Sequence, residues 1–543
     1  MAPAEPIHHP RRPVYAPNGA VATSQPLAAA AGLAVLRRGG NAVDAAIATA
    51  VVLTQVQPGS NDVGGDLFAL VWADGRLHGL NGSGRSPAAL TRDVVLDRST
   101  PADRAPSPAL GGLQASGETL PHRGWLPVTV PGAPAAWRDL HERFGRLPFA
   151  DLFTDAIGYA EHGYPVSPGV AAGWARAARV APHGPEHDEW RRVYLPGGRA
   201  PRAGERFRNP DAARSLRRVA ATGADDFYRG ETAEAVVRFA EATGGLLRAG
   251  DLAGHRSEWV DPIGVDYRGH QVWELPPNGQ GIAALAALKI LDGYPPGHAT
   301  LHRRIEAMKL AFADAHTHVA DPDHHDVPVA GLLDEAYARS RRELIGEQAG
   351  LPAAGEPRRG GTVYLCTADA DGTMVSLIQS NYMGFGAYVA APGTGFGLQN
   401  RGAGFALAEG HPNVVGPGKR PYHTIIPGFL TREGQPVGPF GVMGGHMQPQ
   451  GHLQVVLSTV DDGLDPQAAL DRPRWYWHTG RQVLLEPGLA GTAEEDLRSR
   501  GHEVGVLAEP AAFGYGQIIW RLPDGAGYVA GSEPRADGCA LGY

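Results

Sequence analysis

The chain has 543 residues, of which 43% are hydrophobic and 20% charged, and its formal net charge is -8. This composition is that of a globular protein with ample core material, and the modest charge without long Lys/Arg runs argues against nucleic acid as a partner. Two cysteines, Cys366 and Cys539, cannot build a disulfide framework. The first residues lack the apolar run of a secretory signal. A helix that spans a bilayer needs about 20 consecutive apolar residues, and no segment of the sequence has such a run. We therefore expect a cytoplasmic protein that has no membrane partner.

The first part of the chain predicts two helices followed by two strands. We expect a helix over residues 24–38, a glycine stop, and a second, buried helix over 42–56 that begins after the capping residue Asn41. A loop over 57–66 leads to strands over 67–72 and 76–80. Arg85 then follows among small residues, and a cation in such a loop is a candidate to hold a substrate carboxylate. A plain surface arginine is the other interpretation.

The middle of the chain is predicted to be mainly helical. Pro, Gly and Ser residues over 95–125 predict a long loop. Helical patterns then indicate an α-rich flank over about 130–250. We then expect strands near 265–267 and 271–274 and two more helices over 282–291 and 301–318.

The segment from Gly360 to Asn381 predicts a β-hairpin that starts with a threonine. We expect strands over 362–368 and 373–379, joined by a turn at 369–372. Two glycines precede Thr362, so its hydroxyl could attack the carbonyl of Gly361 without a side chain in the way. Cleavage would make Thr362 a new N-terminus, whose amine, with a pKa of about 7.7 to 8.0, could activate its own hydroxyl.

Two other patterns are weaker candidates for chemistry. Histidines 316, 318, 324 and 325 are metal ligands by type, but their spacing matches no metal site, and the chain has 22 histidines. The glycines over 393–397 have no helix after them, which argues against a dinucleotide site. We therefore expect neither a metal nor a cofactor.

Polar and glycine residues that could complete a catalytic site come after the hairpin. Ser380 and Asn381 place a hydroxyl and an amide directly beyond the second strand. Gly444 and Gly445 form a turn before a helix expected over 450–460. Paired glycine amides ahead of a helix can form an oxyanion hole, although a plain tight turn is the alternative.

Several short motifs recur in a fixed order along nearly the whole chain. They are Gly-Gly-Asn-Ala-Val-Asp-Ala-Ala (39–46), Val-Pro-Gly (130–132), Glu-Ala-Met-Lys (306–309), Gly-Thr (361–362), Gly-Lys-Arg-Pro (418–421), Gly-Gly (444–445), Glu-Pro-Arg (533–535) and Gly-Tyr (542–543). In this order the motifs resemble those of the γ-glutamyltransferases, also called γ-glutamyltranspeptidases or glutathione hydrolases.

The resemblance implies an α+β N-terminal-nucleophile hydrolase with a four-layer αββα sandwich. It implies a precursor that splits between Gly361 and Thr362 into a large subunit (1–361) and a small subunit (362–543), which remain partners. By similarity, Thr362 is the nucleophile, Ser380 supplies the hydroxyl that hydrogen-bonds it, and Gly444 and Gly445 form the oxyanion hole. The implied reaction is acyl transfer from an amide through an acyl-threonine ester, with γ-glutamyl compounds such as glutathione as the family's substrates.

The sequence departs from the γ-glutamyl-binding pattern of that family. Ser83 stands where the family has the arginine that holds the α-carboxylate, with Arg85 two residues on. In the segment that would hold the α-amino group, Asn400 is followed by Arg401 in place of a glutamine, and Gly404 replaces an aspartate. A cation without the acidic group would repel an ammonium. Such a pocket favours an anionic acyl group without an α-amine, and the family's Ser-Ser pair is likewise replaced by His423 and Thr424.

Three functions therefore stay open. The first is the family's γ-glutamyl hydrolase or transferase activity on a small-molecule amide. The second is an amidohydrolase or dicarboxylic acylase of the oxamate amidohydrolase kind, with the acyl group held by Arg85, Arg401 or His423. The third is a non-catalytic binding protein on the same fold, which the presence of Thr362 and Ser380 argues against. A dimer of processed heterodimers is the oligomer we consider.

Overall fold

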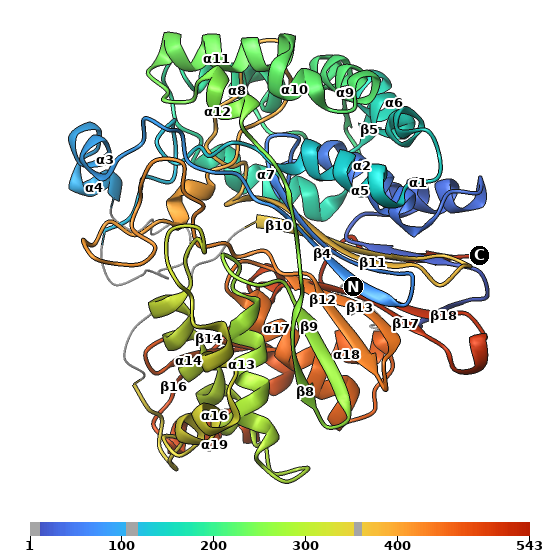
Figure 1. The fold of residues 1–543 in the computed structure, drawn as a ribbon, viewed down its shortest axis with the longest axis vertical. Coiled ribbons are helices and arrows are strands. Elements are labelled where there is room, and N and C mark those ends of the chain that lie inside the picture. The colour runs from blue at the N-terminus through green and yellow to red at the C-terminus, as the bar shows by residue number, and fades with distance from the viewer. Residues whose placement is uncertain (1–10, 105–117, 352–360) are drawn as a thin grey trace, which may run out of the picture.

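The computed structural model describes residues 11–104, 118–351 and 361–543. Within them, two seven-stranded sheets form the centre of the molecule (Figure 1). In spatial order, the first sheet contains β1 (Val14–Ala16), β18 (Tyr528–Ser532), β17 (Tyr515–Arg521), β13 (Gln435–Met443), β12 (Gly428–Arg432), β9 (His270–Glu274) and β8 (Ile263–Tyr267). The second contains β19 (Cys539–Gly542), β2 (Ala20–Thr23), β10 (Gly361–Ala368), β11 (Met374–Tyr382), β3 (Asp66–Ala73), β4 (Arg76–Gly82) and β7 (Glu258–Val260).

The two sheets pack against each other through the strand that begins with the predicted nucleophile. Strand β10 contacts both β13 and β17 of the other sheet. A Cβ atom on Gly441 of β13 would lie 2.5 Å from the ring of Tyr364 on β10, so the absence of a side chain there lets the sheets approach closely. The start of β10 is therefore held inside the protein by strands from both parts of the chain.

Helices pack on the outer side of each sheet. On the sheet that contains β10, α1 (Pro26–Arg37) and α2 (Ala42–Val56) contact β2 and β10. Every residue of α2 is buried, and Asn41 and Asp44 form a capping box at its start. The other sheet is covered by α13 (Gly281–Asp292), α17 (Met447–Val456) and α18 (Pro466–Asp471), and α14 (Leu301–His318) packs on α13 (Figure 1).

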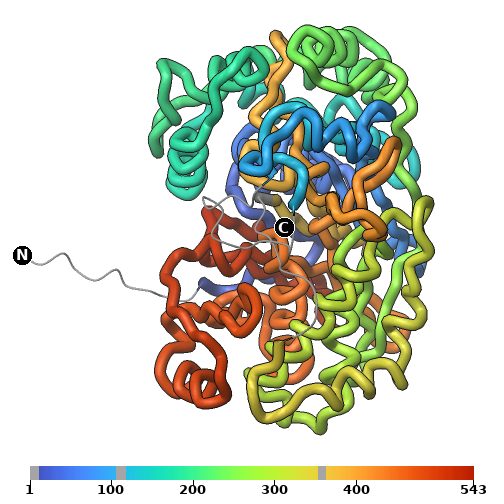
Figure 2. Tube along the Cα trace, turned by 90° about the vertical axis from the view of Figure 1, so that its left-hand side faces the viewer, coloured from blue at the N-terminus to red at the C-terminus, as the bar shows by residue number. Residues whose placement is uncertain are grey.

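A group of helices forms the end of the molecule that contains α2 (Figure 1). Both views place this group opposite the end formed by α13, α14 and α19 (Figures 1 and 2). A two-stranded sheet of β5 (Tyr164–Pro165) and β6 (Arg206–Phe207) lies within it. The group contains α5 (Ala133–Phe144), α6 (Thr154–His162), α7 (Pro168–Arg179), α8 (Asp188–Tyr194), α9 (Pro210–Thr222), α10 (Asp225–Arg229), α11 (Glu231–Thr243) and α12 (Ala249–Ala253).

The remaining elements are short. A three-stranded sheet is formed by β14 (Trp475–Thr479), β15 (Gln482–Leu485) and β16 (Glu503–Val506). The other helices are α3 (Arg92–Arg98), α4 (Pro101–Arg104), α15 (Val329–Leu332), α16 (Glu335–Arg342) and α19 (Thr492–Ser499). Single helical turns are η2 (Phe149–Phe153), η3 (Pro196–Gly198), η4 (Arg401–Gly404), η5 (Leu457–Asp461), η6 (Pro487–Leu489), η7 (Pro510–Phe513) and η8 (Pro523–Gly525).

The α+β prediction is confirmed, and so are the two predicted strand pairs. Strands β10 and β11 pair antiparallel, as do β3 and β4. One local prediction was wrong in part, and one predicted helix begins earlier than expected. The expected loop over 95–125 includes helical residues of α3 and all of α4, where Thr91 caps α3 and Pro101 begins α4, and its residues 105–117 lie outside the described residues. The helix expected over 450–460 is α17, which starts three residues earlier and passes into a π-helical turn at Leu457. Among the residues described, no helix is long and apolar enough to cross a bilayer.

Candidate active site

The candidate nucleophile, Thr362, lies at a β-bulge. Gly361 pairs with Tyr382 and Val363 pairs with Gln379, so two residues of β11, Ser380 and Asn381, lie opposite Thr362. Bulges are common next to active sites because they redirect a side chain. Here the Oγ1 atom of Thr362 lies 3.2 Å from the Oγ atom of Ser380, and Thr362 is only 1% exposed. The predicted pair of hydroxyls is thus brought together by the hairpin.

A buried arginine lies next to this pair of hydroxyls. Arg401 begins η4, and its Nη2 atom donates to Ser380 Oγ at 3.2 Å. Its Nη1 atom donates to Thr424 Oγ1 at 2.8 Å, and its guanidinium lies 4.3 Å from the centre of the Tyr382 ring. The Nε atom is buried and has no hydrogen-bond partner among the described residues. Burial lowers the pKa of Arg401 to about 10, which still leaves the group positively charged at neutral pH.

The carboxylate of Asp66 offsets the positive charge of Arg401 and forms a hydrogen bond with His423. Burial raises the pKa of Asp66 to about 6, against the opposing effect of Arg401. The Oδ1 atom accepts hydrogen bonds from Gln399 Nε2 at 2.9 Å and from the amide of Gly84 at 3.1 Å. The Oδ2 atom lies 3.1 Å from His423 Nε2. Burial and the nearby arginines lower the pKa of His423 well below its usual value, so its imidazole is neutral and donates this hydrogen bond.

The turn after β13 places two free amides near the cavity. Gly444 and Gly445 have φ angles of +134° and +62°, which favour glycine. Their carbonyl oxygens accept hydrogen bonds from the amides of Met447 and Gln448. Their own amides donate to none of the residues that the structure describes. Unused amides ahead of a helix are available to a developing oxyanion.

A cavity of about 370 Å³ reaches Thr362 and Gly444. Asn400 also lines it, and both ends of the Asn400 side chain hold neighbouring loops. Its Oδ1 atom accepts from the amide of Met383 at 3.1 Å, and its Nδ2 atom donates to the carbonyl of His122 at 2.8 Å. Asn381 is also buried, outside the cavity lining, and its amide group has no hydrogen-bond partner within the described parts of the chain.

The structure does not bring Arg85 to the cavity. Its guanidinium donates to Asp321 at 3.0 Å and also pairs with Asp323 and Glu258. Arg85 is not among the described residues that line the cavity. Of the three groups considered for an acyl carboxylate, Arg85 is thus bound to other carboxylates, and His423 uses its N–H on Asp66. Arg401 is fully buried and does not line the cavity either, but it is the cation that donates to Ser380.

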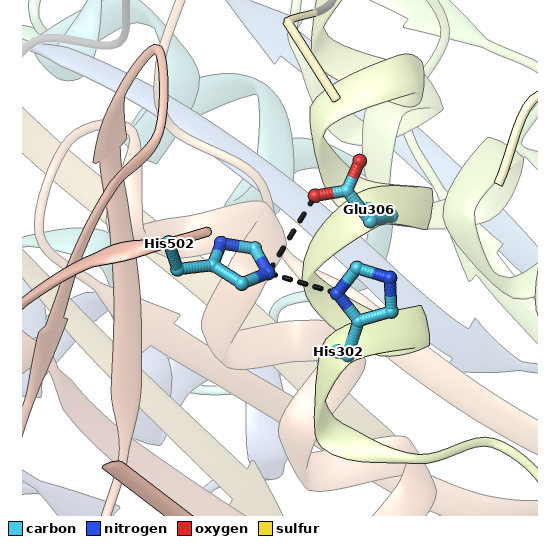
Figure 3. A group of neighbouring side chains, drawn as sticks. All are labelled: His302, Glu306 and His502. Atoms are coloured by element: carbon cyan, nitrogen blue, oxygen red, sulfur yellow. Dashed lines mark hydrogen bonds and ion pairs between the residues drawn. The ribbon is translucent and has the colours of Figure 1, made fainter. Parts of the chain in front are cut away.

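One group of side chains has the composition of a metal site, away from the predicted histidines. His302 Nδ1 lies 2.8 Å from His502 Nε2, which is 3.8 Å from Glu306 Oε1 (Figure 3). Lys309 Nζ donates to the same Glu306 oxygen at 2.7 Å. The ammonium and the histidine–histidine hydrogen bond already occupy these ligand atoms. The group joins α14 to residues 346–350, since Glu306 accepts from the amide of Gly350.

Sequence reasoning missed two parts of the site. Asp66 follows a Gly-Gly pair, but no sequence pattern indicates that its carboxylate offsets the positive charge of Arg401, which comes more than 300 residues later in the chain. The aromatic cavity wall was also missed, and it combines Trp174 of α7 with Phe385 and Tyr388. Their rings lie together, with centroids of Trp174 and Phe385 5.5 Å apart. Such contacts arise from tertiary structure and leave no local pattern.

Comparisons with known proteins identify the family of this chain. A family profile described as Gamma-glutamyltranspeptidase matches residues 28–543. The chain is 35% identical to the glutathione hydrolase-like YwrD proenzyme of Bacillus subtilis, over 95% of this chain and 97% of that one. It is 34% identical to the oxamate amidohydrolase proenzyme of Klebsiella pneumoniae, over 97% and 98%. The crystal structure of a cephalosporin acylase from Bacillus halodurans is similar, with 50% identity, a TM-score of 0.93 and coverage of 100% and 99%.

The first two relatives are named as hydrolase proenzymes, and the cephalosporin acylase shares the fold of this chain over nearly its full length. The chain therefore belongs to the γ-glutamyltranspeptidase family and is an enzyme with the N-terminal-nucleophile hydrolase fold.

Proposed function

We propose that this protein is a self-cleaving threonine amidohydrolase that releases an amine from amides with an anionic acyl group. One observation carries the proposal. The hydroxyl of Thr362, directly after Gly361, lies 3.2 Å from Ser380 at the end of a cavity that also reaches the unused amide of Gly444. Nucleophile, hydroxyl partner and oxyanion donor thus meet at one place.

Self-cleavage follows from the same arrangement. Thr362 Oγ attacks the carbonyl of Gly361, the C–N bond breaks, and the amine of Thr362 takes a proton while an ester forms. Water hydrolyses the ester and leaves residues 1–361 and 362–543 as two subunits. Because β10 lies between strands of both subunits, we infer that they stay together. We also infer that the two sheets, with helices on their outer sides, form a four-layer αββα sandwich.

Turnover repeats this chemistry on a substrate amide. The free amine of Thr362 takes the Oγ proton as Oγ bonds to the acyl carbon, and the amides of Gly444 and Gly445 stabilise the oxyanion. The C–N bond then breaks and the proton passes to the leaving amine. Water next adds to the acyl-threonine ester, which releases the acid and restores the hydroxyl. Ser380 donates to or accepts from Thr362 Oγ1 and holds its orientation.

Arg401 supports an anionic acyl group. Its guanidinium lies one hydrogen bond beyond Ser380, and its Nε–H has no partner among the described residues. A carboxylate on a short acyl chain attached to Thr362 could accept a charge-assisted hydrogen bond from this guanidinium. The same positive charge, without an acidic residue at Gly404, would repel the α-ammonium of a γ-glutamyl group. An oxamate-like or dicarboxylic acyl group is therefore our preferred substrate, with γ-glutamyl compounds as the alternative.

The test is to follow the purified chain by denaturing electrophoresis, intact mass and N-terminal sequencing, beside Thr362→Ala and Thr362→Ser. We expect the wild-type chain to give two fragments, the smaller beginning at Thr362. Thr362→Ala should stay whole, and Thr362→Ser should cleave because it keeps the hydroxyl. A folded wild-type chain that never cleaves would favour the non-catalytic binding protein instead.

A further inference from the structure

Gln280 is a buried glutamine that contacts two segments of the candidate active site. It lies directly before α13 and is fully buried. Its Nε2 atom donates to the carbonyl oxygen of Thr424 at 2.7 Å and to that of Gly445 at 2.9 Å. Its Oε1 atom accepts from the hydroxyl of Tyr422 at 3.2 Å. Both N–H donors of the side-chain amide are thus in use, and so is its oxygen.

The backbone around Gln280 supports the first of these segments. The amide of His423 donates to the carbonyl of Asn278 at 2.9 Å, and the amide of Gln280 donates to the carbonyl of His423 at 2.9 Å. The hydroxyl of Thr424, the next residue, accepts from Arg401 Nη1 at 2.8 Å. The bonds to residues 278–280 therefore also position the cation that we assign to the acyl group.

The second segment is the glycine turn that carries the unused amides. Glycine peptides adopt many conformations, so Gly444 and Gly445 do little to fix the direction of their own amides. The carbonyl of Gly445 accepts from the amide of Gln448, three residues later, at 3.1 Å. Gln280 donates to the same oxygen from a distant part of the chain. This bond restrains the turn and thereby the direction in which its amides point.

We propose that Gln280 is a positioning residue that holds the oxyanion donors and Arg401 in one fixed arrangement. The inference rests on the proposed function, in which the acyl carbonyl lies at the glycine turn and the acyl carboxylate at Arg401. Gln280 acts through Gly445 and Thr424, whose carbonyl oxygens it binds with a single nitrogen atom. Because Gln280 precedes the cleavage site and both partners follow it, these hydrogen bonds join the two subunits after self-cleavage.

The test replaces Gln280 by methionine, which has a similar length and no amide. The uncharged valeryl-4-nitroanilide reports on the glycine turn, because its acyl group has no carboxylate for Arg401. We expect its kcat to fall about 10-fold to 100-fold in Gln280→Met with little change in KM, because displaced oxyanion donors act in the transition state. The preference for glutaryl-4-nitroanilide over the valeryl compound should also fall, by about 2-fold to 10-fold, because Thr424 loses a hydrogen bond that supports it.

Gln467→Met is the matched control. Gln467 is also buried, and its amide donates to Asp471 at 2.8 Å and to the carbonyl of Ser532 at 3.0 Å, while its oxygen accepts from the amide of Ser532. It lies on α18, and these partners have no part in the proposed chemistry. We expect both variants to unfold at a lower urea concentration than the wild type, and Gln467→Met to keep the wild-type kcat and glutaryl preference.

An unchanged kcat for the valeryl anilide in Gln280→Met, or an unchanged glutaryl preference, would overturn this role. An equal loss in Gln467→Met would also overturn it, because the effect would then come from stability alone. Should Gln280→Met fail to fold, Gln280→Asn applies the same test, since its amide is one CH₂ too short to reach both carbonyl oxygens. A wild-type chain that neither cleaves itself nor hydrolyses either anilide would overturn the proposed function together with this role, whereas an active wild type with an unaffected variant would overturn the role of Gln280 alone.

Discussion

Replacing Arg401 by glutamine tests which cation selects the acyl group. The shorter amide side chain of Arg401→Gln could still donate to Ser380 or Thr424, so the change removes the charge and keeps part of the hydrogen bonding. A charge-assisted hydrogen bond contributes about 1.5 to 3 kcal/mol, so we expect a 10-fold to 100-fold loss of kcat/KM for an acyl group with a carboxylate. Asp66 loses the cation that lowers its pKa, and removing one partner from buried opposite charges costs about 3 to 5 kcal/mol of stability.

The assay compares glutaryl-4-nitroanilide with the uncharged valeryl-4-nitroanilide, which share the leaving amine. The matched control is Arg85→Gln, since Arg85 is the other arginine considered for the acyl carboxylate and pairs with Asp321. We expect Arg401→Gln to lose the preference for the glutaryl group and Arg85→Gln to keep it. Self-cleavage and chemical unfolding of both variants separate loss of selectivity from loss of fold.

The opposite pattern would refute this reasoning. If Arg401→Gln keeps the preference for a carboxylate while Arg85→Gln abolishes it, the carboxylate binds at Arg85 after its ion pairs are broken. If neither variant changes the preference, the acyl group lies elsewhere, and the role given to Arg401 is wrong.

Three further changes have defined outcomes. Gly444→Ala places a Cβ 3.1 Å from the Cα atom of Gly514 at a φ of +134°, and we expect about a 100-fold fall in kcat of the mature enzyme. Glu533→Gln leaves the buried Arg474 without the carboxylate that lies 2.8 Å from it, and the free energy of unfolding measured in urea should fall by about 3 to 5 kcal/mol. Burial raises the pKa of Asp62 to about 7, so the folded state holds a proton that the unfolded chain releases near pH 4, and stability from this group falls as the pH rises from about 4 to about 7. Asp62→Asn should flatten that part of the stability–pH curve, and an unchanged slope would contradict the assignment.

Much of the segment around the candidate nucleophile could be predicted because its signals are local. Two runs rich in β-forming residues and the Asp-Ala-Asp-Gly turn predict the hairpin of β10 and β11, and antiparallel pairing then places Ser380 opposite Thr362. The capped, wholly buried helix α2 and the Gly-Gly turn at Gly444 are likewise encoded by neighbouring residues. The order of the motifs along the chain indicates the family.

The choice of the charged residue in the site was decided by tertiary structure. From the sequence, Arg85, Arg401 and His423 were equal candidates, because a cation's partners lie far away in the chain. Asp321, 236 residues from Arg85, binds one of them, and Asp66 takes the N–H of His423. Arg401 alone of the three lies beside Ser380. The cavity, with Arg123 over Tyr388, likewise exists only once distant loops meet. Burial and long-range pairing set these charges, and neither can be deduced from spacing along one chain.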